Sequence, residues 1–274
     1  MTGLPLPRPG RRLGAPGVPY LVAGIAVFSV QDLILKLLSG TYPLSEAMVL
    51  RSLTAFPLLL VLVRLSGGYA TLFITVFSVL LLREPVGPRH WAAVAVGFGG
   101  VLVMLRPGTD LFDWAALLAL FSGLSYALSM IAARYLGPTE TAAALAFWGN
   151  VVFLGCAVLM AVLFGHGAFA AEIHPSLGFL FRGWVTPTAR DLMLMMACGA
   201  ITAAGLTLLT QAYRVSASAI VAPFEYTAML WGVVWGWLFW RDWPDAAGWS
   251  GIVVIVGAGL YVLYREAPTA PRRT

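Results

Sequence analysis

The chain has 274 residues, of which 60% are hydrophobic and only 11% are charged. Its mean hydropathy of +0.86 leaves too little polar surface for a water-soluble domain, so the composition indicates a polytopic, all-α membrane protein. The net charge of +5 does not favour nucleic-acid binding, because the arginines are scattered between apolar runs instead of forming a patch.

Residues 1–19 are basic and rich in proline and glycine, and we expect them to be disordered. The apolar run that follows contains Asp32 and Lys36 and lacks a small-residue cleavage site. These features favour an uncleaved first membrane helix over a secretory signal peptide.

Nine apolar stretches follow the N-terminal segment, and most are close to the roughly 20 residues that cross a hydrocarbon core as a helix. We expect helices because backbone groups in lipid need internal hydrogen-bond partners. The stretches are 20–38, 47–65, 69–82, 91–105, 114–136, 142–164, 192–213, 217–240 and 246–264. The long segment between the sixth and seventh stretches is expected to be a surface loop with a short interfacial helix.

The positions of the arginines predict the orientation of these helices. With a cytoplasmic N-terminus, eleven basic residues lie on the cytoplasmic side and four on the other side, which fits the positive-inside rule. We therefore expect both termini, including the tail 267–274, to be cytoplasmic.

The number of apolar stretches conflicts with that orientation. Two cytoplasmic termini require an even number of crossings, and the conflict falls on the short stretch 69–82, where Arg64 and Arg83 both favour the cytoplasmic side. We infer that one helix and part of the next are absent near Gly67 and Gly68, through an internal deletion or a gap in the sequence itself. The alternative is a true eight-crossing protein with one re-entrant hairpin.

A hairpin pattern occurs twice in the chain, once over 80–106 and once over 216–266. Aligned without gaps, four pairs of residues match: Arg83 with Arg241, Glu84 with Asp242, Trp91 with Trp249 and Gly99 with Gly257. The two turns fall on opposite sides of the membrane in the predicted topology. Inverted repeats of this kind are typical of alternating-access transporters, which bind their substrate near the midplane between the halves.

The segment APFEYTAMLWGVVWGWLFWRDWPD, with the glycine-rich helix after it, resembles the second domain of EamA-type transporters of the drug/metabolite transporter superfamily. LLLREPVGPRHWAAVAVGFGGVLVMLRPG resembles the end of their first domain. FSVQDLILKLLSGTYPLSEAMVLRSLTAFP resembles the first hairpin of S-adenosylmethionine uptake proteins, with Asp and Lys in helix one and Arg in helix two.

The resemblance implies a ten-helix fold in the bacterial inner membrane that exports or takes up a small metabolite. On this basis we expect a first repeat over 20–106, incomplete near 67–68, and a second over 107–266. It also implies a monomer, because family carriers hold both halves of the pore in one chain; a homodimer is the alternative. Neither a cofactor nor a metal is implied.

Four charged side chains lie well inside apolar runs, where each costs roughly 2.5–3.5 kcal/mol unless it has a partner or a wet cavity. Asp32 and Lys36 share a helix face, and Arg51 lies at the same distance as Asp32 from the turn between their helices. We therefore expect an Asp32–Arg51 pair, serving either as a structural tie or as a substrate or ion contact. Glu225 directly follows the segment loosened by Pro223, where it would suit proton coupling; the alternative is a helix-end acid that reaches cytoplasmic water.

Other polar and aromatic residues inside the predicted helices complete the candidate cavity, and most of the remaining ones are expected to join helices by hydrogen bonds. The cavity candidates are Asp32, Lys36, Arg51, Tyr126, Trp148, Asn150, Gln211, Glu225 and Tyr226. Six tryptophans near the outer end of the last hairpin are expected to form an interfacial belt: Trp231, Trp235, Trp237, Trp240, Trp243 and Trp249.

The sequence thus favours a secondary transporter of a small organic compound, such as an amino acid, a nucleoside-like or a drug-like molecule, and not an enzyme. A membrane-embedded enzyme would need a general base, and none of the core runs contains a histidine. An inactive or partnering membrane protein is the further alternative, because of the missing helix. His166 and His174, with Glu172 between them, offer only a weak metal pattern, and Cys156 and Cys198 are expected to serve in packing.

Overall fold

The structure is a computed structural model that describes residues 16–66, 114–167 and 178–266. Within these ranges the chain is helical and has no strand. The expected helices over 69–82 and 91–105, the expected loss near Gly67 and Gly68, and the terminal segments 1–15 and 267–274 lie outside the described residues. Residues 17–19, expected to be disordered, instead form the start of the first helix.

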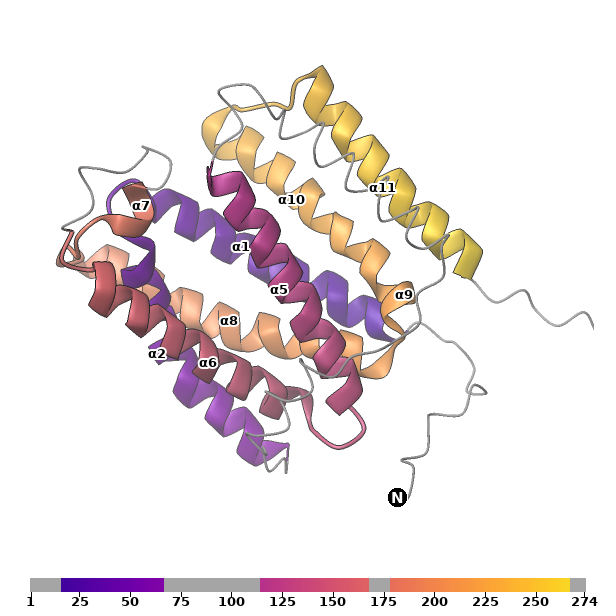
Figure 1. Cartoon of the computed structure of the whole chain (residues 1–274), viewed down its shortest axis with the longest axis horizontal. Helices are drawn as coiled ribbons and strands as arrows, with labels where there is room; N and C mark the ends of the chain where they lie inside the picture. Colours follow the sequence, from indigo (N-terminus) through magenta and orange to yellow (C-terminus); the bar gives the residue numbers. More distant parts are fainter. Residues whose placement is uncertain (1–15, 67–113, 168–177, 267–274) are drawn as a thin grey trace, which may run out of the picture.

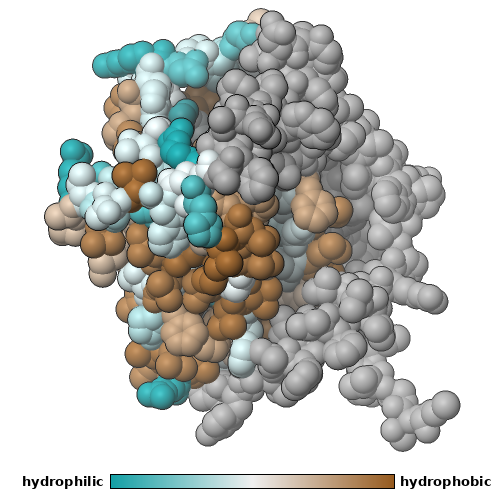
Figure 2. Space-filling view, turned by 60° about the vertical axis from the view of Figure 1, so that its left-hand side comes forward, coloured by the Kyte–Doolittle hydropathy of each residue, from teal (hydrophilic) through white to brown (hydrophobic). Residues whose placement is uncertain are grey.

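The described chain contains six long helices and a divided seventh one. The long helices are α1 (Gly17–Leu38), α2 (Leu44–Leu65), α5 (Trp114–Leu136), α6 (Ala142–Phe164), α8 (Ala189–Val215) and α11 (Ala246–Glu266), and a short helix α7 spans Gly178–Phe181. Of these, α1, α2, α6 and α8 are long and apolar enough to cross a membrane. Figure 2 shows hydrophobic residues gathered in a band between hydrophilic residues at both ends. The prediction of an all-α polytopic membrane protein is confirmed.

Helix α8 lies at the centre of the described bundle, against α1 and α2, and also touches α5 and α6 (Figure 1). Glycines allow the backbones to approach closely at these crossings. A Cβ on Gly199 would lie 2.6 Å from the backbone oxygen of Arg51, and one on Gly24 would lie 2.9 Å from Leu209. Small residues therefore fix how deeply α1 and α2 settle against α8.

The expected helix over 217–240 is divided into four parts. It begins as α9 (Ser218–Val221), tightens into the 3₁₀ segment η2 (Ala222–Tyr226), continues as α10 (Thr227–Trp235) and widens into the π-helical turn η3 (Gly236–Trp240). Pro223 stands at the start of η2, and proline has no backbone N–H to continue an α-helical ladder. The loosening predicted at Pro223 is therefore present.

One end of the bundle is held by the segment before α8. Arg182 donates to the backbone oxygens of Ser39 (3.2 Å) and Gly40 (2.7 Å) in the α1–α2 turn. Tyr42, in the same turn, donates to the carboxylate of Asp191 at 2.7 Å. This outer clasp, as we name the contacts of residues 182–191 with the α1–α2 turn, fastens the first hairpin to α8.

The opposite end of the bundle is tied by two arginines. Arg134, at the end of α5, donates to the backbone oxygen of Ser216 at 2.5 Å, and the backbone N–H of Gly17 donates to the hydroxyl of that serine at 2.9 Å. Arg214 donates to the backbone oxygen of Gly137 at 2.8 Å. The start of α1 and the ends of α5 and α8 therefore share one side, as the predicted alternation of helices requires.

Candidate functional site

A buried polar cluster lies where α1, α2 and α8 meet. Arg51 of α2 is only 8% exposed and Gln31 of α1 only 3%. A guanidinium can only donate hydrogen bonds, so the amide oxygen of Gln31 must face it. In that orientation the oxygen accepts from Arg51 Nη1 at 2.8 Å, and the amide nitrogen donates to Thr202 Oγ1 (2.6 Å) and to the backbone oxygen of Cys198 (3.2 Å). Gln31 thus links all three helices.

The contact between Gln31 and Arg51 confirms that these parts of α1 and α2 lie at matching depth. The predicted pairing of Asp32 with Arg51 takes a different form, however. The two opposite charges attract each other, but the direct contacts of Arg51 within the described residues are Gln31 and the ring of Phe153, whose centroid is 4.6 Å from Arg51 Cζ. The interaction between Asp32 and Arg51 is therefore electrostatic, without a hydrogen-bonded ion pair.

Asp32 and Lys36 lie one turn apart on α1, on the side that meets the last hairpin. Lys36 Nζ stands 4.0 Å from the centroid of the Trp240 ring in η3, a cation–π contact. Asp32 is exposed as a residue. The three charges of the predicted trio are thus separated instead of forming one compact network.

Asn150 connects helix α6 to the polar cluster around Arg51. Its side-chain nitrogen donates to the backbone oxygen of Ser52 at 3.1 Å, next to Arg51 in the chain. Four buried polar atoms have no hydrogen-bond partner among the described residues: Asn150 Oδ1, Ser52 Oγ, Arg51 Nε and Trp148 Nε1. Buried polar atoms normally have partners, so such atoms are where an ordered water or a ligand group is expected to bind.

A second polar cluster surrounds Glu225 in η2. Tyr126 of α5 and Tyr213 of α8 both donate to Glu225 Oε1, each at 2.9 Å. Glu225 is partly buried, and it lies in the one 3₁₀ segment among the described helices. The carboxylate therefore ties the irregular part of the last hairpin to two regular helices.

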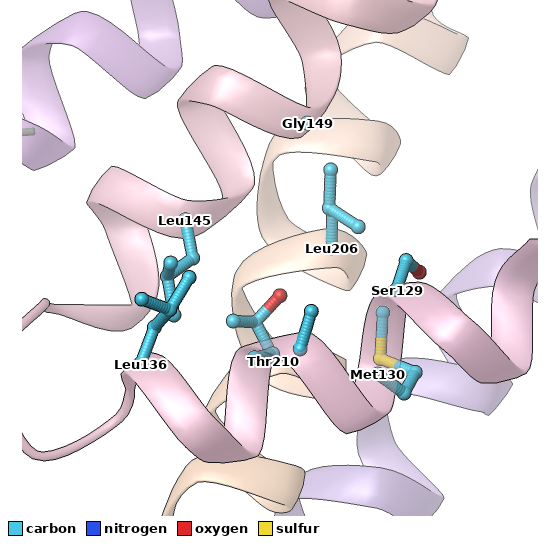
Figure 3. Close-up of a pocket in the computed structure, with 9 residues that line it drawn as sticks. Ser129, Met130, Leu136, Leu145, Gly149, Leu206 and Thr210 are labelled. Carbon is cyan, nitrogen blue, oxygen red and sulfur yellow. The ribbon is translucent and has the colours of Figure 1, made fainter. Parts of the chain in front are cut away.

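The two clusters lie along the same helix. Thr202 and Tyr213 are both on α8, about 16 Å apart at the α-helical rise. Between these levels, a cavity of about 100 Å³ is lined by α5, α6 and α8, with the hydroxyls of Ser129 and Thr210 in an otherwise apolar wall (Figure 3). Pockets for drug-sized ligands enclose about 300–1,000 Å³, so this cavity would have to open to hold a metabolite.

The structure places the predicted site residues in different roles. It joins Tyr126 to Glu225 directly and brings Asp32, Arg51 and Asn150 to the first cluster. Gln211 instead accepts from Arg214 at 3.4 Å, near the end of α8. Trp148 packs beside the apolar cluster of α2, α6 and α8, and Tyr226 is partly buried next to Glu225.

Three residues of the clusters were not predicted as site residues: Gln31, Thr202 and Tyr213. Gln31 directly precedes Asp32 and is one of the few polar residues inside the first helix, so a polar side chain in an apolar run was a usable signal. No spacing in the sequence connects Tyr213 with Tyr126. In the described part of the chain, no group of three or more His, Cys, Asp or Glu side chains could hold a metal ion; Glu172 and His174 lie outside that part.

Comparison with curated proteins gives several relatives with a common activity. The chain is 32% identical to a riboflavin transporter of Rhizobium johnstonii over 71% of its own length and 58% of that protein. It is 25% identical to an S-adenosylmethionine uptake transporter of Rickettsia prowazekii, over 71% of this chain and 60% of that one. These relatives are EamA/DMT-type transporters, so the chain is similar to members of that family.

A third EamA/DMT-type relative shares a longer region with the chain. The pseudopaline exporter CntI of Pseudomonas aeruginosa is 25% identical over 91% of this chain and 76% of its own length. The chain spans about 60% of the length of the riboflavin and S-adenosylmethionine transporters that it matches. No family model and no solved structure matches it. The protein is a multi-pass bacterial membrane protein.

Proposed function

We propose that this protein is a secondary transporter that moves a small organic metabolite across the bacterial inner membrane by alternating access, and that it is not an enzyme. The observation that carries the proposal is the tied carboxylate of Glu225 in a broken membrane helix. Interrupted helices at membrane depth are typical of binding and coupling sites in transporter folds. The similarity to uptake and export proteins supports the same activity.

Glu225 supplies the coupling step in this proposal. As a carboxylate, its Oε1 accepts from Tyr126 and Tyr213 and holds η2 against α5 and α8. A proton on the carboxyl group weakens it as an acceptor, since hydrogen bonds to a charged group are roughly twice as strong as neutral ones. The last hairpin then separates from α5 and α8, and the cavity beside α8 opens.

The remaining candidates form the substrate path. We assign Asp32, Lys36 and Arg51 to substrate contact, with Asn150 and Trp148 beside them on α6. Tyr126 and Tyr226 lie at the Glu225 end of the path, and Gln211 lies about one turn of α8 before Arg214. Both termini are placed in the cytoplasm and the outer clasp on the opposite side, in accordance with the arginine distribution.

Transport by the full chain reconstituted in vesicles tests this function. Riboflavin and S-adenosylmethionine are the first compounds to supply, because relatives are named for them. We expect uptake of one of them above that of empty vesicles, with a rate that changes at least severalfold when a proton gradient is imposed. The proposal would be contradicted if vesicles with the protein and vesicles without it took up both compounds, and amino acids as a class, at equal rates.

An inactive or partnering membrane protein is the second candidate function. The observation that favours it is the coverage of about 60% of the riboflavin and S-adenosylmethionine transporters. Two copies could then be needed to enclose one pore, whereas a single copy is the expected carrier. Crosslinking of single-cysteine variants in the membrane, combined with the vesicle assay, separates an active monomer from an active dimer and both from an inactive chain.

A further inference from the structure

Arg51 is a buried cation whose direct partners carry no charge. Its Nη1 donates to the amide oxygen of Gln31, and its guanidinium lies over Phe153. Its Nε has no hydrogen-bond partner in the described part of the chain, although the residue is only 8% exposed. Burying a charge in a membrane protein is costly unless an opposite charge or water compensates it. A free donor edge on a buried guanidinium is therefore a ready site for an anionic group.

Asp32 provides the opposite charge a short distance away. It is exposed, it attracts Arg51 electrostatically, and it forms no hydrogen bond within the described residues. Lys36, one turn further along α1, contacts the Trp240 ring. Arg51 and Asp32 thus present one cation and one anion that do not neutralise each other by contact.

We propose, building on the transport function above, that this site binds an amino-acid-type zwitterion, with the substrate carboxylate on Arg51 and the substrate cation on Asp32. A guanidinium and a carboxylate form parallel, charge-assisted hydrogen bonds, the strongest kind available to a side chain. A bound zwitterion would neutralise both protein charges at once. A neutral compound would leave both uncompensated.

Gln31 is the positioning residue for this site. Its amide oxygen fixes the direction of Arg51 Nη1, and its nitrogen is anchored on Thr202 and Cys198 of α8. The position of the guanidinium is therefore set by the crossing of three helices. The proposal also separates the substrate class of this chain from that of its relative at 32% identity, since riboflavin has no ionised group at neutral pH.

Ligand-induced thermal stabilisation of the purified full chain in detergent tests the substrate class without requiring transport. The probes are S-adenosylmethionine, L-methionine, riboflavin and 5′-methylthioadenosine, which keeps the adenosine and thioether of the first probe but lacks its amino-acid group. We expect the two zwitterions to raise the unfolding temperature by about 2–4 °C near saturation, and the two uncharged compounds to leave it unchanged. An equal shift with riboflavin or 5′-methylthioadenosine, or no shift with either zwitterion, overturns the proposal.

Two variants assign the effect to the site. Arg51→Gln and Asp32→Asn are each expected to weaken zwitterion binding by about tenfold to a hundredfold, whereas Arg64→Gln, on an exposed arginine at the end of the same helix, leaves it unchanged. If Arg51→Gln does not fold, Asp32→Asn alone decides, because Asp32 is exposed and contributes little to packing. Unchanged binding in Asp32→Asn overturns the assignment. Zwitterion binding without vesicle transport would contradict the proposed function and leave the substrate class supported.

Discussion

Tyr126 and Glu225 are 99 residues apart in the chain, yet the tyrosine hydroxyl donates to the glutamate Oε1 at 2.9 Å. Tyr213 donates to the same oxygen from α8. One carboxylate oxygen thus joins α5, α8 and the 3₁₀ segment of the last hairpin. A single proton on that group is enough to weaken two helix contacts at once, which makes Glu225 the most informative residue to change.

Glu225→Gln is expected to abolish the effect of a proton gradient on transport while the protein still folds. The neutral amide oxygen can still accept from both tyrosines, as weakly as a protonated carboxyl group does, but the side chain cannot take up or release a proton. The measurement is the ratio of uptake rates with and without the gradient, which should fall to about one. A gradient effect as large as that of the unmodified protein, at equal expression, would assign the coupling to another group.

Exchanging the charges of Asp32 and Arg51 is expected to leave transport abolished. A structural ion pair would work in either direction, but Arg51 is held by Gln31 and Phe153 and not by Asp32. The double variant Asp32→Arg with Arg51→Asp should therefore be as inactive as either single variant. Recovery of at least half of the original rate would show instead that the two side chains serve only to join α1 and α2.

Gly199→Ala is expected to destabilise the crossing of α2 and α8. The new Cβ would lie 2.6 Å from the backbone oxygen of Arg51 and close to Thr54, and backbone atoms cannot move aside as a flexible side chain can. Overpacking of this kind typically costs about 1–3 kcal/mol. Thermal unfolding in detergent measures the loss as a lower midpoint.

Gly155→Ala is the matched control for that substitution. Gly155 is also inside a membrane helix, but a Cβ there meets nothing within 4 Å. The free energy of unfolding of the Gly155→Ala variant should be unchanged or higher by up to about 1 kcal/mol, the ordinary gain in helix propensity from glycine to alanine. Equal loss of stability in both variants would mean that close packing at Gly199 is not what α8 requires.

Tyr42→Phe is expected to loosen the outer clasp. The hydroxyl donates to Asp191 at 2.7 Å and accepts from the backbone N–H of Thr188 at 3.2 Å, and Tyr42 is only 4% exposed. Its loss removes both hydrogen bonds between the α1–α2 turn and the start of α8, so the unfolding midpoint should fall. Thermal unfolding checks this, with Tyr135→Phe on an exposed tyrosine as the control.

A double-mutant cycle separates the clasp from a general effect of the substitution. Asp191→Asn combined with Tyr42→Phe should cost less than the sum of the two single changes, because both act on the same hydrogen bond: asparagine accepts it more weakly than the carboxylate, and phenylalanine removes its donor. Strict additivity of the two losses would argue that Tyr42 and Asp191 stabilise the protein independently.

The amino-acid sequence alone determined the number and placement of most described helices. The predicted stretches 114–136 and 142–164 coincide with α5 and α6, and the others differ from the observed helices mainly at their ends. The reason is that the length of an apolar run is matched to the thickness of the hydrocarbon core, and lipid leaves the backbone no alternative to a helix. Pro223 likewise predicted the irregular segment, since a missing N–H is a local property of the chain.

The tertiary structure alone decided which side chains meet. Asp32 had the charge expected opposite Arg51, but its neighbour Gln31 holds that position, because one residue along a helix turns the side chain by about 100° and only the crossing of α1, α2 and α8 selects the direction. Tyr213 met Glu225 for the same reason. Residue types and depths in the membrane follow from the sequence, whereas the partners of a polar side chain depend on how the helices rotate about their axes when glycines let them pack.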